Sequence, residues 1–260
     1  MSDARLIYTR AGAVARILFD NPKQHNALTH SMWCELRDVC RQVADDPSVR
    51  VVTFRGVGGK AFISGTDISG FEAFTAGRDG ITYERHIDEC MAAVDALPVP
   101  SIAVIEGWAV GGGLNIFSAA DFRIATPTAR FASPLGRTIG NCLSMSSCAR
   151  IAAAVGVTAA KRMLLLGETI SAQQMLSSGV LYAMVEPAEV DATVDALCQL
   201  AIPNAPLTTY ASKEMIRRLT YASLPNVDDL IERVYGSEDF RRGVRNFLEK
   251  KKTVPEWSGS

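Results

Sequence analysis

The pattern of apolar and polar residues predicts strands alternating with helices along the first part of the chain. Residues 5–20 form two β-type runs around Ala11-Gly12, which is typical of a hairpin. Residues 30–46 place apolar side chains at helical intervals, with Thr29 or Ser31 available as the N-cap. Residues 49–58 predict a short buried strand that runs into a glycine-rich loop.

The same pattern continues and then changes. A helix is predicted from about Thr82 to Leu97, where Pro98 and Pro100 end it. A strand over 101–110 and a helix over 114–121 follow, and residues 122–132 form a strand pair or a strand and a turn. From about Ser144 onward the periodicity is mostly helical. Strands alternating with helices, followed by a helical C-terminal region, indicate an α/β core with a helical appendage.

Composition narrows the class of protein. At 260 residues and 48% hydrophobic content, the chain is long enough for one domain with a large core, and its net charge of −1 argues against nucleic-acid binding by bulk electrostatics. Six cysteines and three histidines show no spacing typical of a metal site or a disulfide framework. No signal peptide or membrane-spanning run stands out, so we expect a cytoplasmic protein without membrane contacts.

Three consecutive glycines, 111–113, lie between a predicted strand and a predicted helix. They do not match the dinucleotide fingerprint, because the glycine spacing differs and Asp121 comes too early. Bare backbone at a helix start can direct an N–H toward an anion or a carbonyl that becomes one. Close packing of the strand against the helix is the alternative reason for the glycines.

A second stretch, "GGKAFISGTDISGF" (58–71), has the same layout. It too follows an apolar strand and leads through small residues to an acidic turn at Asp67, whose carboxylate would cap backbone N–H groups. Two such turns would place two N–H donors around one oxygen. The sequence therefore predicts an oxyanion hole.

Five segments in matching order resemble the enoyl-CoA hydratase/isomerase (crotonase) superfamily, over roughly residues 5 to 257. They are "DNPKQHNALTHSM", "KAFISGTDI", "PVPSIAVIEGWAVGGGLNIFSAADFRIATPTARFASP", "LLLGETISAQQMLSSGVLYAMV" and "SEDFRRGVRNFLEKKKTVPEW". The resemblance implies a ClpP-like spiral of ββα units with C-terminal helices, assembled as a homotrimer or a dimer of trimers. We accordingly expect a spiral core over 1–200 and a helical trimerisation or lid region over 201–260.

The resemblance also implies the substrate and its site. The substrate would be an acyl-CoA thioester, with no cofactor beyond its CoA moiety and no metal. By position, the backbone N–H groups of Thr66 and Gly112 would bind the thioester oxygen. The residues that would contact CoA are Lys23, Ala61, Ser64, Asp67, Ile68 and Gly111, and the tail lysines Lys250, Lys251 and Lys252 would either meet CoA phosphates or form a solvated helix end.

The chain departs from the family pattern at the two positions where hydratases carry glutamates. The first is Asn115, and the second is Leu135, or Gly136 if the alignment shifts by one residue. None of these side chains can take up a proton at neutral pH. Because general acid–base catalysis loses both of its usual carriers, ordinary enoyl-CoA hydration is not expected.

Other groups near these positions are candidates to replace them. Arg137 would suit a substrate carboxylate, or it would lie at the surface in an ion pair. His86 or Glu89 would supply a base, or they would occupy a solvated helix face. Further polar groups follow Arg137, and we expect them to cap a helix or to form hydrogen bonds within the loop. They are Asn141, Cys142, Ser144 and Ser146.

The sequence thus predicts a crotonase-fold acyl-CoA enzyme that stabilises a thioester enolate. Isomerisation, decarboxylation and carbon–carbon cleavage are the reactions compatible with its residues. A non-catalytic CoA-thioester-binding protein and an acyl-CoA thioester hydrolase are the alternatives.

Overall fold

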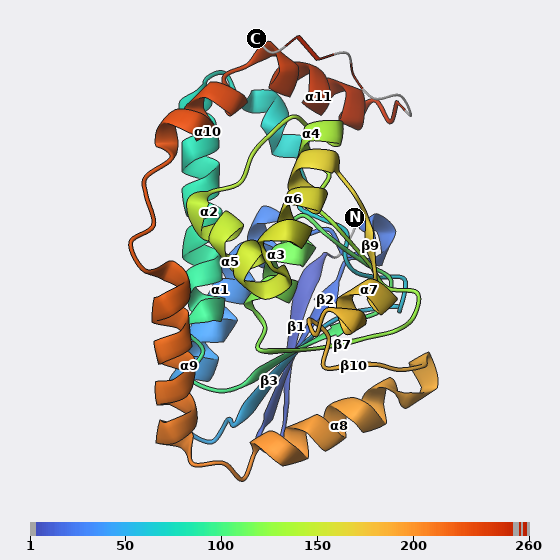
Figure 1. Ribbon diagram of the computed structural model, residues 1–260, viewed down its shortest axis with the longest axis vertical. Coiled ribbons are helices and arrows are strands. Elements are labelled where there is room, and N and C mark those ends of the chain that lie inside the picture. Colours follow the sequence, from blue (N-terminus) through green and yellow to red (C-terminus); the bar gives the residue numbers. More distant parts are fainter. Residues whose placement is uncertain (1–3, 252–254, 256, 259–260) are drawn as a thin grey trace.

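The computed structural model describes residues 4–251, 255 and 257–258, in which two sheets are surrounded by helices (Figure 1). The larger sheet has the strand order β1-β2-β3-β5-β7-β10 and the smaller one β4-β6-β8-β9. The strands of the larger sheet are β1 (Arg5–Ala11), β2 (Val14–Asp20), β3 (Val51–Gly56), β5 (Ser101–Ile105), β7 (Phe122–Ala125) and β10 (Ala183–Met184). Those of the smaller sheet are β4 (Ala61–Ile63), β6 (Trp108–Val110), β8 (Arg130–Ala132) and β9 (Ile170–Ser171).

Successive strands from β3 to β8 alternate between the two sheets. β3, β5 and β7 pair in parallel in the larger sheet, while β4, β6 and β8 pair in parallel in the smaller one. A helix follows each pair of strands before the chain begins the next turn. This repetition is a spiral of ββα units, which confirms the predicted fold class.

The helices carry most of the remaining chain, and the C-terminal region is helical as predicted. In the larger first part they are α1 (His30–Ala44), α2 (Gly77–Asp95), α3 (Gly112–Ala119), α4 (Leu135–Thr138), α5 (Met145–Val155), α6 (Val157–Leu166), α7 (Ala172–Ser177) and α8 (Val190–Ala201). The last three are α9 (Pro206–Tyr221), α10 (Asp228–Tyr235) and α11 (Glu238–Leu248). Short 3-10 helices span Pro22–Gln24, Ser69–Ala73 and Pro187–Glu189.

Two of the predicted elements form for the expected local reasons. β1 and β2 pair antiparallel around Gly12, with Ala11 opposite Val14, so the hairpin is confirmed. The side chain of Thr29 accepts a hydrogen bond from the Met32 N–H at 3.2 Å, so Thr29 rather than Ser31 caps α1.

The helix predicted from about Thr82 begins earlier, at Gly77. The carboxylate of Asp79 accepts hydrogen bonds from the backbone N–H groups of Thr75, at 2.7 Å, and Ala76, at 2.9 Å. These bonds satisfy donors that the helix itself leaves unpaired, and a carboxylate is stabilised at the positive end of a helix. The helix therefore begins at a carboxylate in its first turn, several residues before the apolar pattern that predicted it.

The single strand predicted over 101–110 is wrong, because the segment divides into β5 and β6. Gly107 separates them with a φ of 71°, and a Cβ there would lie 1.9 Å from the Lys60 carbonyl oxygen. β5 is buried along its whole length in the larger sheet, whereas β6 pairs with β4 and β8 in the smaller one. The glycine turn lets one apolar run serve two sheets.

The last two helices close over the segment that follows β4. α10 packs against α2, and α11 packs against the 3-10 helix Ser69–Ala73 and α4. Phe71, Ile139, Tyr235 and Phe240 form the centre of a separate apolar cluster at this junction. Figure 1 shows α10 and α11 at one end of the molecule and α9 running down its side. Within the described residues, no helix is long and apolar enough to span a membrane.

Candidate active site

The two predicted turns meet in the folded chain. Thr66 follows β4 and Gly112 follows β6, and these strands are parallel neighbours, so their carboxyl ends lie at the same edge of the smaller sheet. A Cβ placed on Gly112 would lie 2.9 Å from Thr66 Oγ1 and 2.9 Å from the Trp33 ring. The Thr66 and Trp33 side chains therefore leave no room for a Cβ at position 112.

The hydrogen bonds around Thr66 show where its N–H points. Leu28 and Thr66 form an isolated parallel bridge, in which the Leu28 N–H donates to the Gly65 oxygen and the Asp67 N–H donates to the Leu28 oxygen. In a parallel bridge of this kind the N–H of the central residue faces away from its partner. Thr66 thus presents its N–H on the side away from Leu28.

Gly112 presents its N–H for a different reason. It is the first residue of α3, and the first N–H groups of a helix have no acceptor within the helix. The neighbouring Gly111 N–H, by contrast, donates to the Ala132 oxygen at 3.2 Å. Two N–H donors on adjacent turns, one of them at the positive end of a helix, form an arrangement suited to an oxyanion.

Two aromatic residues that sequence reasoning missed contact Thr66. The Trp33 Nε1–H of α1 donates to Thr66 Oγ1 at 3.3 Å, and the Tyr83 hydroxyl of α2 lies beside the same side chain. Both helices are distant from Thr66 in the sequence, so no local pattern identifies these contacts. Both contacts hold the Thr66 side chain in place.

The residues predicted to contact CoA lie on or beside the loop that carries Thr66. Ser64 is half-buried and its hydroxyl donates to the Gln24 oxygen at 2.9 Å, whereas Lys23 is exposed in the 3-10 helix nearby. Asp67 accepts the Ser69 N–H at 2.9 Å, so it caps the turn as expected. Ala61 and Ile68 are buried. Their contact with CoA stays a prediction.

Asn115 lies in the first turn of α3 with its side chain buried and fully engaged. Its Nδ2 donates to Ser147 Oγ at 2.9 Å, and its Oδ1 accepts from Arg150 Nη1 at 2.7 Å. Arg150 in turn makes a salt bridge with Asp95 at 2.7 Å. Asn115 is therefore part of a rigid polar network, with no titratable proton of its own to exchange.

The second departure from the family pattern lies in α4. Leu135 is half-buried and Gly136 is exposed, so no titratable side chain stands at either position. Arg137 is exposed, and its aliphatic part lies against Gly167 at the end of α6. Among the described contacts, none joins Arg137 to Thr66, Gly112 or Asn115. The structure does not bring this arginine to the predicted oxyanion hole.

The other candidates for the missing base have different surroundings. His86 is half-buried, and its ring stacks on His30 of α1 with the centroids 4.4 Å apart, while Glu89 is exposed. Burial raises the pKa of the Cys142 thiol to about 12, which leaves it protonated and unreactive at neutral pH. Ser144 caps α5 by accepting the Ser147 N–H at 3.1 Å, as expected.

The basic tail is only partly described. Lys251 forms an ion pair with Glu249 at 2.5 Å, and Lys250 follows α11 with a φ of 53°. Lys252 lies outside the described residues. Contact of this tail with CoA phosphates stays a prediction.

Glu84 is a buried carboxyl group that sequence reasoning missed. It lies on α2 next to Tyr83 and is 3% exposed. It accepts hydrogen bonds from the Tyr235 hydroxyl at 2.6 Å and from the Ser144 N–H at 2.8 Å. Burial raises the pKa of Glu84 to about 7, and the two hydrogen bonds only partly offset it. A helical face of mixed polarity gives no signal for such a group.

Replacing Glu84 by glutamine is expected to remove a pH-dependent loss of stability. In the unfolded chain this carboxyl ionises near pH 4.5, whereas in the folded chain it ionises near pH 7. Below about pH 4.5 both states are protonated, and between about pH 4.5 and 7 ionisation of the unfolded state lowers the free energy of unfolding by up to about 3 kcal/mol. Urea unfolding of both proteins at about pH 5 and pH 8 measures the difference. Identical pH dependence in the two proteins would contradict the assignment.

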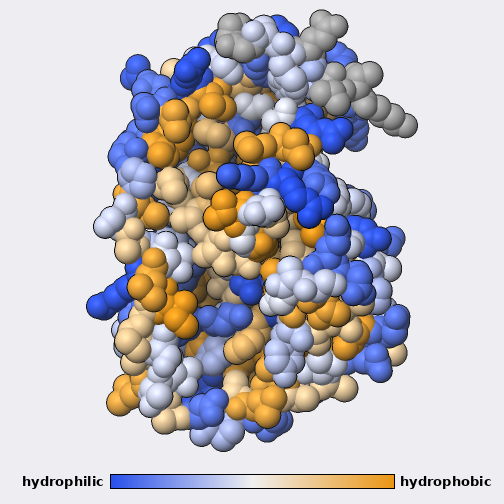
Figure 2. All heavy atoms as spheres, viewed as in Figure 1, coloured by the Kyte–Doolittle hydropathy of each residue, from blue (hydrophilic) through white to orange (hydrophobic). Residues whose placement is uncertain are grey.

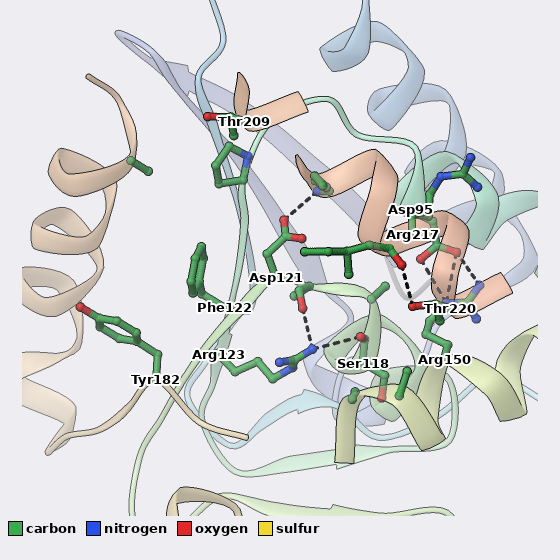
Figure 3. A pocket seen from close by; sticks show the side chains of 18 of the residues that line it. Asp95, Ser118, Asp121, Phe122, Arg123, Arg150, Tyr182, Thr209, Arg217 and Thr220 are labelled. Atoms are coloured by element: carbon green, nitrogen blue, oxygen red, sulfur yellow. Dashed lines mark hydrogen bonds and ion pairs between the residues drawn. The ribbon is translucent and has the colours of Figure 1, made fainter. Parts of the chain in front are cut away.

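A cavity of about 700 Å³ lies elsewhere, between α8, α9 and the end of α3, and neither Thr66 nor Gly112 lines it. Figure 3 shows Arg123 pointing toward Ser118 and Arg150 toward Asp95, with Phe122 and Tyr182 on another side. The Arg123 side chain donates to the carbonyls of Phe117, at 2.8 Å, and Ala120, at 2.6 Å. Because its charged groups are occupied by helix capping and ion pairs, this cavity is a poorer candidate for chemistry.

Comparisons with known proteins agree with this geometry. A family model described as enoyl-CoA hydratase/isomerase matches residues 9–260. The chain is 28% identical to the short-chain-enoyl-CoA hydratase of Clostridium acetobutylicum over 95% of both chains. Its structure is similar to a methylmalonyl-CoA decarboxylase complexed with 2S-carboxypropyl-CoA, with a TM-score of 0.88 and 26% identity over the whole of both chains. For an enoyl-CoA hydratase/carnithine racemase from Magnetospirillum magneticum the TM-score is 0.79 and the identity 28%, over 98% of this chain and 96% of that one.

Proposed function

The chain belongs to the enoyl-CoA hydratase/isomerase family of acyl-CoA enzymes, and from this premise we propose that it releases carbon dioxide from a carboxylated acyl-CoA thioester. The observation that carries the proposal is the pairing of Thr66 and Gly112 at one edge of the smaller sheet, next to an Asn115 that cannot move a proton. The site retains two N–H donors that would stabilise an enolate, and it lacks the two glutamates that would add water.

Decarboxylation would need only the two N–H donors of the predicted oxyanion hole. The bond between Cα and the carboxylate breaks, its electron pair enters the thioester enolate, and carbon dioxide leaves. The N–H groups of Thr66 and Gly112 would stabilise the negative oxygen, at about 3–4 kcal/mol for each donor. Water would then protonate Cα to give the shortened acyl-CoA, so no general base is required to form the enolate.

The apolar residue in α4 supports the same reaction. Leu135 stands where hydratases of the family carry their second glutamate, and a substrate carboxylate held against such an apolar side chain would lose hydration until carbon dioxide leaves. The similarity in structure to a methylmalonyl-CoA decarboxylase supports it as well. Several relatives are named hydratases, so hydration is the reaction that the experiment has to separate from decarboxylation.

Mass spectrometry of the purified protein with three thioesters tests the proposal. We expect methylmalonyl-CoA or malonyl-CoA to lose carbon dioxide and crotonyl-CoA to remain unchanged. Efficient hydration of crotonyl-CoA would overturn the proposal. Release of free CoA from all three thioesters would favour a thioester hydrolase, and binding without turnover would favour a CoA-thioester-binding protein.

The proposed assembly is a homotrimer or a dimer of trimers. Apolar side chains remain exposed around the large cavity, with Leu200 63%, Ile216 65% and Phe122 37% exposed. In Figure 2 apolar residues border a hollow on this face of the molecule. Apolar surface gathered at one place is typical of a contact between chains, and we propose that a second copy covers it.

Ile216→Asp is expected to reduce the oligomer to smaller species. Light scattering should give the mass of three or six chains for the unmodified protein and a lower mass for the variant, because a buried unpaired carboxylate opposes association. Val157→Asp is the matched control, since Val157 is also exposed but lies outside the cavity lining. Equal masses for the unmodified protein and Ile216→Asp would argue against this contact surface.

A further inference from the structure

Two helices bring histidine and cysteine side chains together outside the predicted oxyanion hole. His30 and Cys34 are four residues apart on α1, so they lie on one face of that helix. His86 lies on α2, which packs against α1. One ligand atom of each of these three residues lies within 4.8 Å of the other two.

The detailed contacts fit a tetrahedral ion. The Cys34 sulfur lies 3.8 Å from His30 Nε2, and the His30 and His86 rings stack at 4.4 Å. A zinc ion bonds histidine nitrogen at about 2.0–2.1 Å and cysteine sulfur at about 2.3 Å, which separates two such ligands by roughly 3.5 Å. Side-chain rotations that open the stack of the two rings would therefore bring the three atoms to one ion.

The surroundings allow an ion to enter. His30 is exposed, and Cys34 and His86 are half-buried, so the cluster opens to solvent. Arg37, which follows Cys34 on α1, has its charge paired with Asp38 at 2.8 Å. The exposed Glu89 adds a negative charge near His86.

We propose that His30, Cys34 and His86 form a site for Zn²⁺, with water completing the four ligands. The donor set of two imidazoles and one thiolate suits zinc better than magnesium or calcium, which prefer oxygen ligands. Such an ion would join α1 to α2 close to two residues beside Thr66, since Trp33 precedes Cys34 and Tyr83 lies three residues before His86. The proposal is independent of the reaction proposed above.

Cys90 defines the boundary of this site. Its sulfur lies 3.8 Å from His86 Nε2, four residues earlier on α2, but the side chain is completely buried. It does not share the mutual 4.8 Å spacing of the other three residues. Cys34 and Cys90 thus offer a matched pair of substitutions, one inside the site and one next to it.

The test uses Co²⁺ and Zn²⁺ on the full-length protein after treatment with a chelator. We expect Co²⁺ to give a tetrahedral spectrum with a thiolate charge-transfer band, and one equivalent of Zn²⁺ to displace it and raise the Tm. His30→Ala, Cys34→Ala and His86→Ala should each weaken Zn²⁺ binding at least about tenfold, since loss of an outer-shell partner alone costs about 10–100-fold. Cys90→Ala and His25→Asn should retain the affinity of the unmodified protein.

Three results would overturn the proposal. One is an octahedral Co²⁺ spectrum without the charge-transfer band. Another is Zn²⁺ affinity that Cys34→Ala leaves unchanged. The third is equal loss of affinity in Cys90→Ala and Cys34→Ala while both variants keep the Tm of the unmodified apoprotein, which would shift the site to the buried thiol. The readouts are spectroscopic and thermal, so their outcome is separate from that of the decarboxylation assay.

Discussion

Thr66→Pro is expected to lower kcat/KM for the carboxylated thioester substrate by about 10²–10³-fold, equivalent to about 3–4 kcal/mol of transition-state stabilisation. Proline has no N–H, so the substitution removes one of the two proposed donors to the enolate oxygen. The Thr66 N–H faces away from the Leu28 bridge, so no ladder hydrogen bond is lost. The preceding residue is Gly65, which has no Cβ to clash with the proline ring.

Thr66→Val is the matched control for this substitution. Valine has nearly the same shape as threonine and keeps the backbone N–H, but it loses the hydroxyl that accepts from Trp33 Nε1. We expect kcat/KM within a few-fold of the unmodified protein. Steady-state kinetics together with thermal unfolding checks both variants. If proline and valine reduce kcat/KM equally at similar Tm, the N–H of Thr66 has no part in the reaction.

Arg150→Met is expected to lower the free energy of unfolding by about 3–5 kcal/mol, or the Tm by roughly 10 °C. The Arg150 side chain is 3% exposed and its partner Asp95 is 9% exposed, with Nη2 and Oδ2 2.7 Å apart. The guanidinium also lies 5.6 Å from the centre of the Tyr221 ring, and the Tyr221 hydroxyl donates to Asp95 at 2.8 Å. Removing the arginine leaves a buried carboxylate without its counter-charge.

A double substitution separates the charge from the packing. Arg150→Met combined with Asp95→Leu removes both charges, and we expect it to recover most of the lost stability because apolar replacement of a buried pair is often neutral. Urea unfolding followed by circular dichroism gives the three free energies. A loss below about 1 kcal/mol in Arg150→Met would show that the pair is solvated rather than buried.

The network around Arg150 also gives Asn115 a structural role at the position where hydratases of the family carry a glutamate. Its amide both donates to Ser147 and accepts from Arg150, and these contacts join α3 to α5. The sequence shows that position 115 cannot titrate, because asparagine has no suitable pKa. That the side chain is fixed by a buried arginine follows only from the packing of helices that are distant in the chain.

Where sequence predictions held, the deciding interactions are local. The hairpin over 5–20 and the Thr29 cap of α1 depend on residues a few positions apart, and the glycine run marks the start of α3. The division at Gly107 was missed because both halves are equally apolar, and only the nearby Lys60 carbonyl requires the turn. Arg137 was a candidate because it is close in sequence to Leu135, but α4 directs it against Gly167.

The sequence by itself determined the family, the alternation of strands and helices, the two glycine-rich turns and the loss of titratable groups at Asn115 and Leu135. These properties reside in residue type and short spacing, which the chain carries before it folds. The tertiary structure decided that Thr66 meets Gly112, that burial raises the pKa of Glu84 to about 7, and that the side chains of His30, Cys34 and His86 lie together. Each of these three results depends on the distance between segments that are far apart in the sequence, or on how far their packing excludes water. Only the packing of the folded chain sets these two quantities.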